Sequence, residues 1–134
     1  MTTSVARVAG ISHIALSVSD LERTRAFYVD VMGLEELRRP EFGLPGAWFR
    51  LGDLQLHVLV VPEVAPVGPG LPHLALHVDA DDIPATVAAL VEGGGTLLSE
   101  ARTRDDFGTA VTAAFVTDPD GNVIELTDVG PLVP

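Results

Sequence analysis

The sequence has 134 residues, 47% of them hydrophobic, which is enough to bury the core of one ordinary domain. Its 19 acidic and 8 basic residues give a net charge of -11, which argues against nucleic acid or an anionic membrane surface as a partner. Cysteine is absent, so disulfides and thiolate ligands are excluded and any metal must take nitrogen and oxygen ligands. The N-terminus lacks the apolar core of a signal peptide and no apolar run approaches the ~20 residues of a membrane span, so we expect a cytoplasmic protein.

The first half of the chain predicts a strand, a helix and three further strands. The first strand is expected over 10–18, with large apolar side chains on one face and His13 among small or polar residues on the other. Ser19 or Asp20 is expected to cap a helix over 21–32, which a glycine then ends. The remaining strands of this half are expected over 34–39, 47–51 and 54–61.

The second half repeats the first. A connector rich in proline and glycine, 62–72, divides the two. The second half opens with His73-Leu-Ala-Leu-His-Val, which nearly copies His13-Ile-Ala-Leu-Ser-Val 60 residues earlier (73 minus 13). A helix is expected over 83–92, and strands over 96–101, 110–117 and 121–127. We therefore expect an α+β fold in a single domain, 1–134, built from two βαβββ modules at about 8–61 and 73–128.

Histidine and glutamate recur at equivalent positions of the two modules. His13 and His73 belong to the first strand of each module, and His57 and Glu125 belong to the last. Most neighbours on their own strand faces are small or polar, while the opposite faces carry isoleucine, leucine and valine. The simplest packing places the helices on the apolar faces, so that the polar faces line a concave cavity.

Taken singly, these residues have ordinary explanations. A histidine on a strand is more often hydrogen-bonded or solvated than a metal ligand, and Glu125 fits an edge strand with one solvated face. Taken together they favour a cation, because a buried carboxylate needs a compensating charge that neutral imidazoles do not supply. Imidazole and carboxylate suit a divalent transition metal such as Zn, Ni, Fe, Mn or Co. We therefore predict a metal site.

Five segments resemble the vicinal oxygen chelate superfamily, which includes glyoxalase I, extradiol dioxygenases and bleomycin-resistance proteins. They are His13-Ile-Ala-Leu-Ser-Val, Phe27-Tyr-Val-Asp-Val-Met-Gly-Leu, Leu54-Gln-Leu-His57, His73-Leu-Ala-Leu and Phe115-Val-Thr-Asp-Pro-Asp-Gly-Asn-Val-Ile-Glu125. The resemblance covers 11–127 and implies a curled half-barrel of mixed sheet with helices on its outer faces, often completed across a homodimer. It also implies that the family's four metal positions are occupied by His13, His57, His73 and Glu125.

The resemblance further implies a lyase or isomerase. Such an enzyme chelates a small-molecule substrate through two adjacent oxygens and stabilises an enolate. Glu125 is the expected catalytic base as well as a ligand, because the matching glutamate is the base of glyoxalase I, and His77 is the second choice. Trp48 and Arg50 share one strand face and are either substrate contacts or ordinary surface. Phe107 is a further candidate substrate contact.

His57 is the position where the sequence departs from glyoxalase I, which usually has glutamate or glutamine there. Gln55 is a second candidate for the same position. Extradiol dioxygenases use two histidines and a glutamate and leave this position unused, so an Fe(II) or Mn(II) ring-cleaving dioxygenase is the second interpretation. His77 and Tyr28 are candidates for the further histidine and tyrosine of those enzymes. A metal-free drug-binding protein of the bleomycin-resistance type is the third interpretation, because the acidic charge suits a cationic ligand.

Overall fold

The protein folds as two modules of the same topology in a computed structural model that describes residues 5–7, 11–41, 43–64, 72–105 and 109–129. The strands of module one are β1 (His13–Val18), β2 (Glu36–Leu37), β3 (Gly46–Leu51) and β4 (Leu54–Val60). Those of module two are β5 (Leu74–His77), β6 (Thr96–Arg104), β7 (Val111–Thr117) and β8 (Val123–Thr127). They form two four-stranded mixed sheets with the orders β1-β4-β3-β2 and β5-β8-β7-β6. The predicted α+β fold of two βαβββ modules is confirmed.

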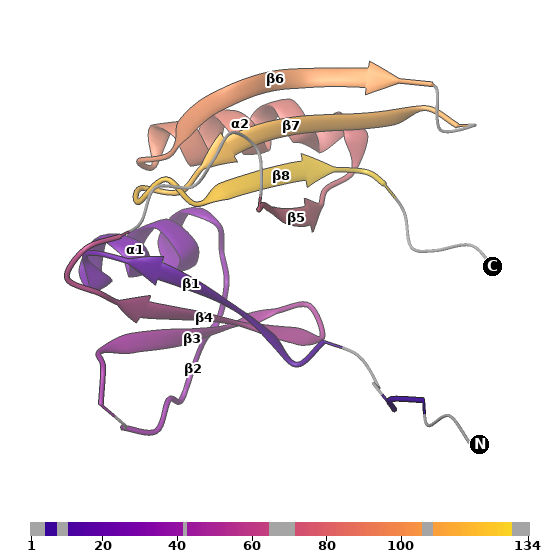
Figure 1. Cartoon of the computed structure of the whole chain (residues 1–134). Helices are drawn as coiled ribbons and strands as arrows, with labels where there is room; N and C mark the ends of the chain where they lie inside the picture. The colour runs from indigo at the N-terminus through magenta and orange to yellow at the C-terminus, as the bar shows by residue number, and fades with distance from the viewer. Residues whose placement is uncertain (1–4, 8–10, 42, 65–71, 106–108, 130–134) are drawn as a thin grey trace.

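The two sheets meet near their first strands. In Figure 1 the sheet of module two lies above the sheet of module one, and β5 and β1 are the strands nearest the opposite sheet. Apolar side chains of both sheets and both helices form one buried cluster, in which Leu56 and Val58 from module one join Ile124 and Leu126 from module two. Because side chains alternate along a strand, the opposite sheet faces, which carry the predicted ligands, are turned away from this shared core.

The helix of module one begins as predicted but changes type. Asp20 caps α1 (Leu21–Arg25) by accepting a hydrogen bond from the backbone N–H of Arg23. The chain then widens into a π-helix over Ala26–Val31, where the amide of Met32 donates to the carbonyl of Phe27 at 2.9 Å. Phe27 and the next residue, Tyr28, are both fully buried, so this wider segment commits two consecutive aromatic side chains to the core.

Module two departs from the prediction mainly at its edge strand. After a short 3-10 turn, Ala80–Asp82, α2 spans Ile83–Glu92 as expected. The strand β6 continues to Arg104, because residues 102–104 pair with the start of β7. The sequence-based prediction that this strand ends at 101 and is followed by a polar loop was therefore wrong. Phe107 lies outside the described residues, as do 65–71 of the predicted connector.

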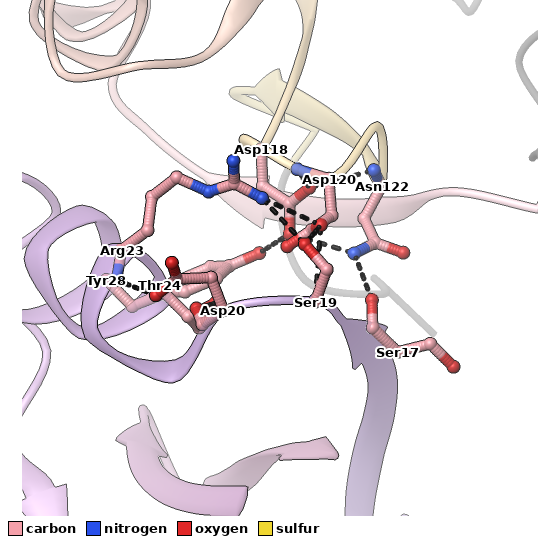
Figure 2. Close-up of polar contacts among 9 residues, drawn as sticks. All are labelled: Ser17, Ser19, Asp20, Arg23, Thr24, Tyr28, Asp118, Asp120 and Asn122. Atoms are coloured by element: carbon pink, nitrogen blue, oxygen red, sulfur yellow. Dashed lines mark hydrogen bonds and ion pairs between the residues drawn. The ribbon is translucent and has the colours of Figure 1, made fainter. Parts of the chain in front are cut away.

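A polar cluster joins the two modules at the turn before β8. Figure 2 shows this turn, 118–122, against the end of β1 and the start of α1. The buried carboxylate of Asp118 accepts a hydrogen bond from the hydroxyl of Tyr28 at 2.8 Å, and the side chain of Asn122 donates to the carbonyl of Ser17 at 3.0 Å. Asp120 accepts from Arg23 at 3.0 Å. These contacts fix the start of β8, and therefore the strand that carries the predicted glutamate, to module one.

No helix of the described residues is long and apolar enough to cross a membrane.

Candidate metal centre

Strand register places the predicted ligands at equivalent points of the two sheets. In module one, His57 on β4 is flanked by Ala15 on β1 and by Trp48 on β3. In module two, Glu125 on β8 is flanked by Ala75 on β5 and by Phe115 on β7. His13 and His73 each lie two residues before the flanking alanine (15 minus 13, and 75 minus 73). The equivalence inferred from the sequence repeat therefore extends to individual residue pairs.

The module-one pair consists of two stacked imidazoles. The rings of His13 and His57 lie with their centroids 4.0 Å apart and their planes 17° from parallel. The indole of Trp48 stacks on the other face of His57, at 4.3 Å and 6°. The edge of the His57 ring contacts Gln55, whose Oε1 lies 2.8 Å from Nε2. Since an amide oxygen can only accept, this contact places the ring proton on Nε2 and leaves Nδ1 with its lone pair.

The environment of His57 favours its neutral form. Partial burial lowers the pKa of His57 below 6.5, and the positive charges of His13 and Arg39 lower the pKa further. Arg39 packs against the backbone of Gly46, where an added Cβ would lie 3.3 Å from the guanidinium carbon. A neutral imidazole is the form that binds a metal, because a protonated ring nitrogen has no lone pair to offer.

The module-two pair joins an imidazole to a carboxylate. Nε2 of His73 lies 3.0 Å from Oε1 of Glu125, and the two side chains are 26% and 17% exposed. The ring of Phe115 meets the His73 ring edge to face, with centroids 5.4 Å apart. His73 itself lies one residue before β5, although the sequence predicts that it begins the strand.

The structure brings the four predicted ligands together as two pairs. Among the residues that the structure describes, no group of three or more histidine, aspartate or glutamate side chains is close enough to hold a metal ion. Each pair nevertheless fits half of a metal site, because three imidazoles and one carboxylate are the donor types that divalent transition metals accept. In module two the carboxylate already lies beside an imidazole, so both donors would be available to the same cation.

The remaining predicted site residues lie in different surroundings. His77 is exposed at the end of β5, in register with Thr127. Arg50 is exposed and forms an ion pair with Glu35 at 2.9 Å. Trp48 contacts His57 directly.

Sequence reasoning missed two residues that lie beside the predicted ligands, Phe115 and Arg39. Phe115 could have been found from the internal repeat, since it occupies in module two the place that Trp48 occupies in module one.

The fold and these paired positions define a class of protein: a duplicated βαβββ protein with matched histidine and glutamate side chains at the first and last strands of each module. The chain belongs to the Glyoxalase/Bleomycin resistance protein/Dioxygenase superfamily, whose sequence model matches residues 10–126. The lactoylglutathione lyase of Haemophilus influenzae is 34% identical over 127 residues, which cover 88% of this chain and 91% of that protein. The lactoylglutathione lyase of Salmonella typhimurium is 32% identical over 125 residues, covering 87% and 90%. A glyoxalase-related enzyme from Fulvimarina pelagi superposes with a TM-score of 0.71 at 26% identity, over 90% of this chain and 88% of that one.

Proposed function

We propose that this protein is a metal-dependent lyase of the glyoxalase type, acting on a small molecule with two adjacent oxygens. The matched pairs His13–His57 and His73–Glu125 carry the proposal, because each stands at the same register position of a duplicated unit and together they offer three nitrogens and one carboxylate. The relatives named lactoylglutathione lyase support this reaction class and make S-lactoylglutathione the product to assay first.

We also propose that the site is completed by a second copy of the chain. Both pairs lie on sheet faces turned away from the core that the modules share, and the described residues of one chain do not bring the pairs into one group. In a homodimer, module one of one chain would meet module two of the other, and each interface would hold one complete set of ligands. This arrangement leaves the contacts of the inter-module cluster intact.

The chain's own residues would divide the chemistry between them. A bound divalent metal would supply Lewis-acid stabilisation of negative charge on the substrate oxygens. Glu125 is the base: its carboxylate takes the proton from the carbon beside the carbonyl and returns it to the neighbouring carbon. Contact with His73 at 3.0 Å orients that carboxylate, and the edge of Phe115 limits the rotation of the imidazole.

The test measures metal content and activity on the same preparation. Protein purified without chelator should contain about one transition metal per chain, and should form S-lactoylglutathione from methylglyoxal and glutathione. Glu125→Gln, which keeps the size of the side chain but removes the base, should lower kcat at least about 100-fold. Glu22→Gln, on the exposed surface of α1, is the matched control and should leave kcat unchanged.

Two outcomes would contradict the proposal. Failure to bind Zn, Ni, Fe, Mn or Co near stoichiometrically would remove both enzyme interpretations and favour a metal-free binding protein. Oxygen consumption with a catechol, in metal-loaded protein that forms no S-lactoylglutathione, would replace the lyase with a ring-cleaving dioxygenase.

A further inference from the structure

The surroundings of Trp48 suggest a role other than contact with substrate. Trp48 lies between Ala47 and Phe49, which are 1% and 0% exposed and face the core. Side chains alternate along β3, so the indole is directed to the opposite, ligand-bearing face. There it stacks on His57, its partner in the β3–β4 register, rather than on a residue reached across a loop. The contact is therefore set by the backbone pairing of two central strands.

The stack restricts how His57 can move. Trp48 covers one face of the imidazole at 4.3 Å and His13 covers the other at 4.0 Å, both nearly parallel to it. An imidazole held between two rings can turn within its own plane but cannot tilt without losing one of the contacts. Nε2 stays against Gln55, and Nδ1, which keeps its lone pair, is therefore held in one direction from which it can bind a cation.

Module two also has an aromatic side chain in contact with a histidine of the predicted metal set, but in a different geometry. Phe115 occupies the register position of Trp48, and its ring meets His73 at 5.4 Å and 88°. In each module, one aromatic side chain of the third strand contacts an imidazole of the predicted metal set. Two independent contacts at equivalent positions are difficult to attribute to general core packing, because both aromatic rings lie outside the shared buried cluster.

We infer that Trp48 is a positioning residue that holds His57 in the orientation a divalent metal requires, and that Phe115 does the same for His73. The inference rests on the metal site of the proposed function, but not on lyase activity. Residues that orient a metal-binding histidine typically contribute 10- to 100-fold to metal affinity. We therefore expect Trp48→Leu to weaken Co(II) binding about tenfold or more, and Trp48→Phe, which keeps a flat ring, to stay within about threefold of the wild type.

Cobalt offers a readout that a merely structural role would not change. The visible absorption of bound Co(II) depends on its ligands and on how they are oriented. Because Trp48→Leu would let the His57 ring tilt, it should alter the spectrum, whereas Trp48→Phe should restore it. Trp48 is also the only tryptophan of the chain. Because it lies 4.3 Å from His57, Co(II) at this site should quench its emission, whereas Zn(II), with a filled d shell, should quench it far less. Phe115→Leu should weaken Co(II) binding to a similar extent while leaving this fluorescence probe in place.

The experiment is a Co(II) titration of wild-type protein and the three variants, each first shown by circular dichroism and thermal unfolding to be folded. Weakened binding and an altered spectrum in Trp48→Leu, with recovery in Trp48→Phe, support the assignment. Stoichiometric Co(II) binding that neither quenches Trp48 in the wild type nor weakens in Trp48→Leu overturns this assignment alone. An absence of Co(II) binding by the wild type overturns the metal centre, and the assignment with it. If Trp48→Leu does not fold, Phe115→Leu decides. Weakened Co(II) binding by this variant supports the assignment, and unchanged Co(II) binding overturns it.

Discussion

Replacing Tyr28 by Phe removes one hydroxyl from the cluster that joins the two modules. That hydroxyl donates to Oδ2 of Asp118 at 2.8 Å, between side chains that are 0% and 2% exposed. Among the described residues, the other donors to the carboxylate are the backbone amides of Asp120 and Asn122 and the side chain of Asn122. Tyr28 is the one of these donors that comes from module one, so the substitution isolates the contact between modules.

The magnitude follows from the charge and burial of the acceptor. A hydrogen bond to a charged group contributes about 1.5–3 kcal/mol, and water cannot easily replace the lost donor at a buried site. We therefore expect Tyr28→Phe to lower the free energy of unfolding by about 2 kcal/mol. With an unfolding entropy of about 2.1 cal/mol/K per residue, 134 residues give about 0.28 kcal/mol/K, so Tm should fall by about 7 °C.

Urea unfolding followed by circular dichroism measures this change directly. The matched control is Thr86→Val, which removes a hydroxyl of α2 that donates to the carbonyl of Asp82, the residue just before that helix. Since this bond is local to module two and its acceptor is neutral, the control should lose less than about 0.5 kcal/mol beyond the propensity cost of valine. A loss below about 0.5 kcal/mol for Tyr28→Phe would refute the reasoning, because the buried carboxylate would then not depend on a donor from the other module.

Three further predictions concern packing, protonation and metal removal. A Cβ at Gly93 would lie 2.5 Å from Cγ2 of Val31, so Gly93→Ala should destabilise the protein by about 1–3 kcal/mol, and adding Val31→Ala should restore part of the loss in a double-mutant cycle followed by urea unfolding. Burial, and to a smaller extent the charges of His13 and Arg39, lowers the pKa of His57 in the folded protein. Because the unfolded chain then binds the proton more readily, the free energy of unfolding should fall as the pH drops below 6.5. His57→Gln should reduce the dependence of the free energy of unfolding on pH, measured by urea unfolding at several pH values. An unchanged dependence would contradict a lowered pKa of His57 in the folded protein. Removing the metal with EDTA should lower the Tm of metal-loaded protein but not that of a His13→Ala/His57→Ala variant, because a ligand bound only to the folded state stabilises it.

The fold was largely predictable because the internal repeat and the periodicity of apolar residues can both be recognised in short stretches of sequence. The copy of His13-Ile-Ala-Leu-Ser-Val at His73 located the two modules, and α2 spans the predicted residues because proline starts it and consecutive glycines end it. The π-helix after Arg25 could not be predicted in this way, since it depends on burying Phe27 and Tyr28 in a core to which both modules contribute. The extension of β6 to Arg104 likewise depends on pairing with β7 rather than on the polar character of its own residues.

The sequence was sufficient to propose which residues form the candidate site, but not how they are arranged in space. Alternation along the strands assigned each ligand to a polar face, and the repeat paired His57 with Glu125. Which polar faces meet depends on how the modules pack, and that is set by contacts far apart in sequence, such as Tyr28 with Asp118. The stacking of Trp48 on His57 required the β3–β4 register, which the hairpin predicts only approximately.

A mixed dimer tests most directly the claim that the metal site is shared between two chains. One variant, His13→Ala/His57→Ala, lacks the module-one pair, and the other, His73→Ala/Glu125→Ala, lacks the module-two pair. In a heterodimer of the two variants, one interface combines both intact pairs and the other combines both damaged pairs. The account predicts that each variant alone binds metal weakly and is inactive, while the purified heterodimer binds about one metal and recovers about half of the wild-type activity. A heterodimer that is as inactive as its parents and binds metal as weakly would contradict a shared site.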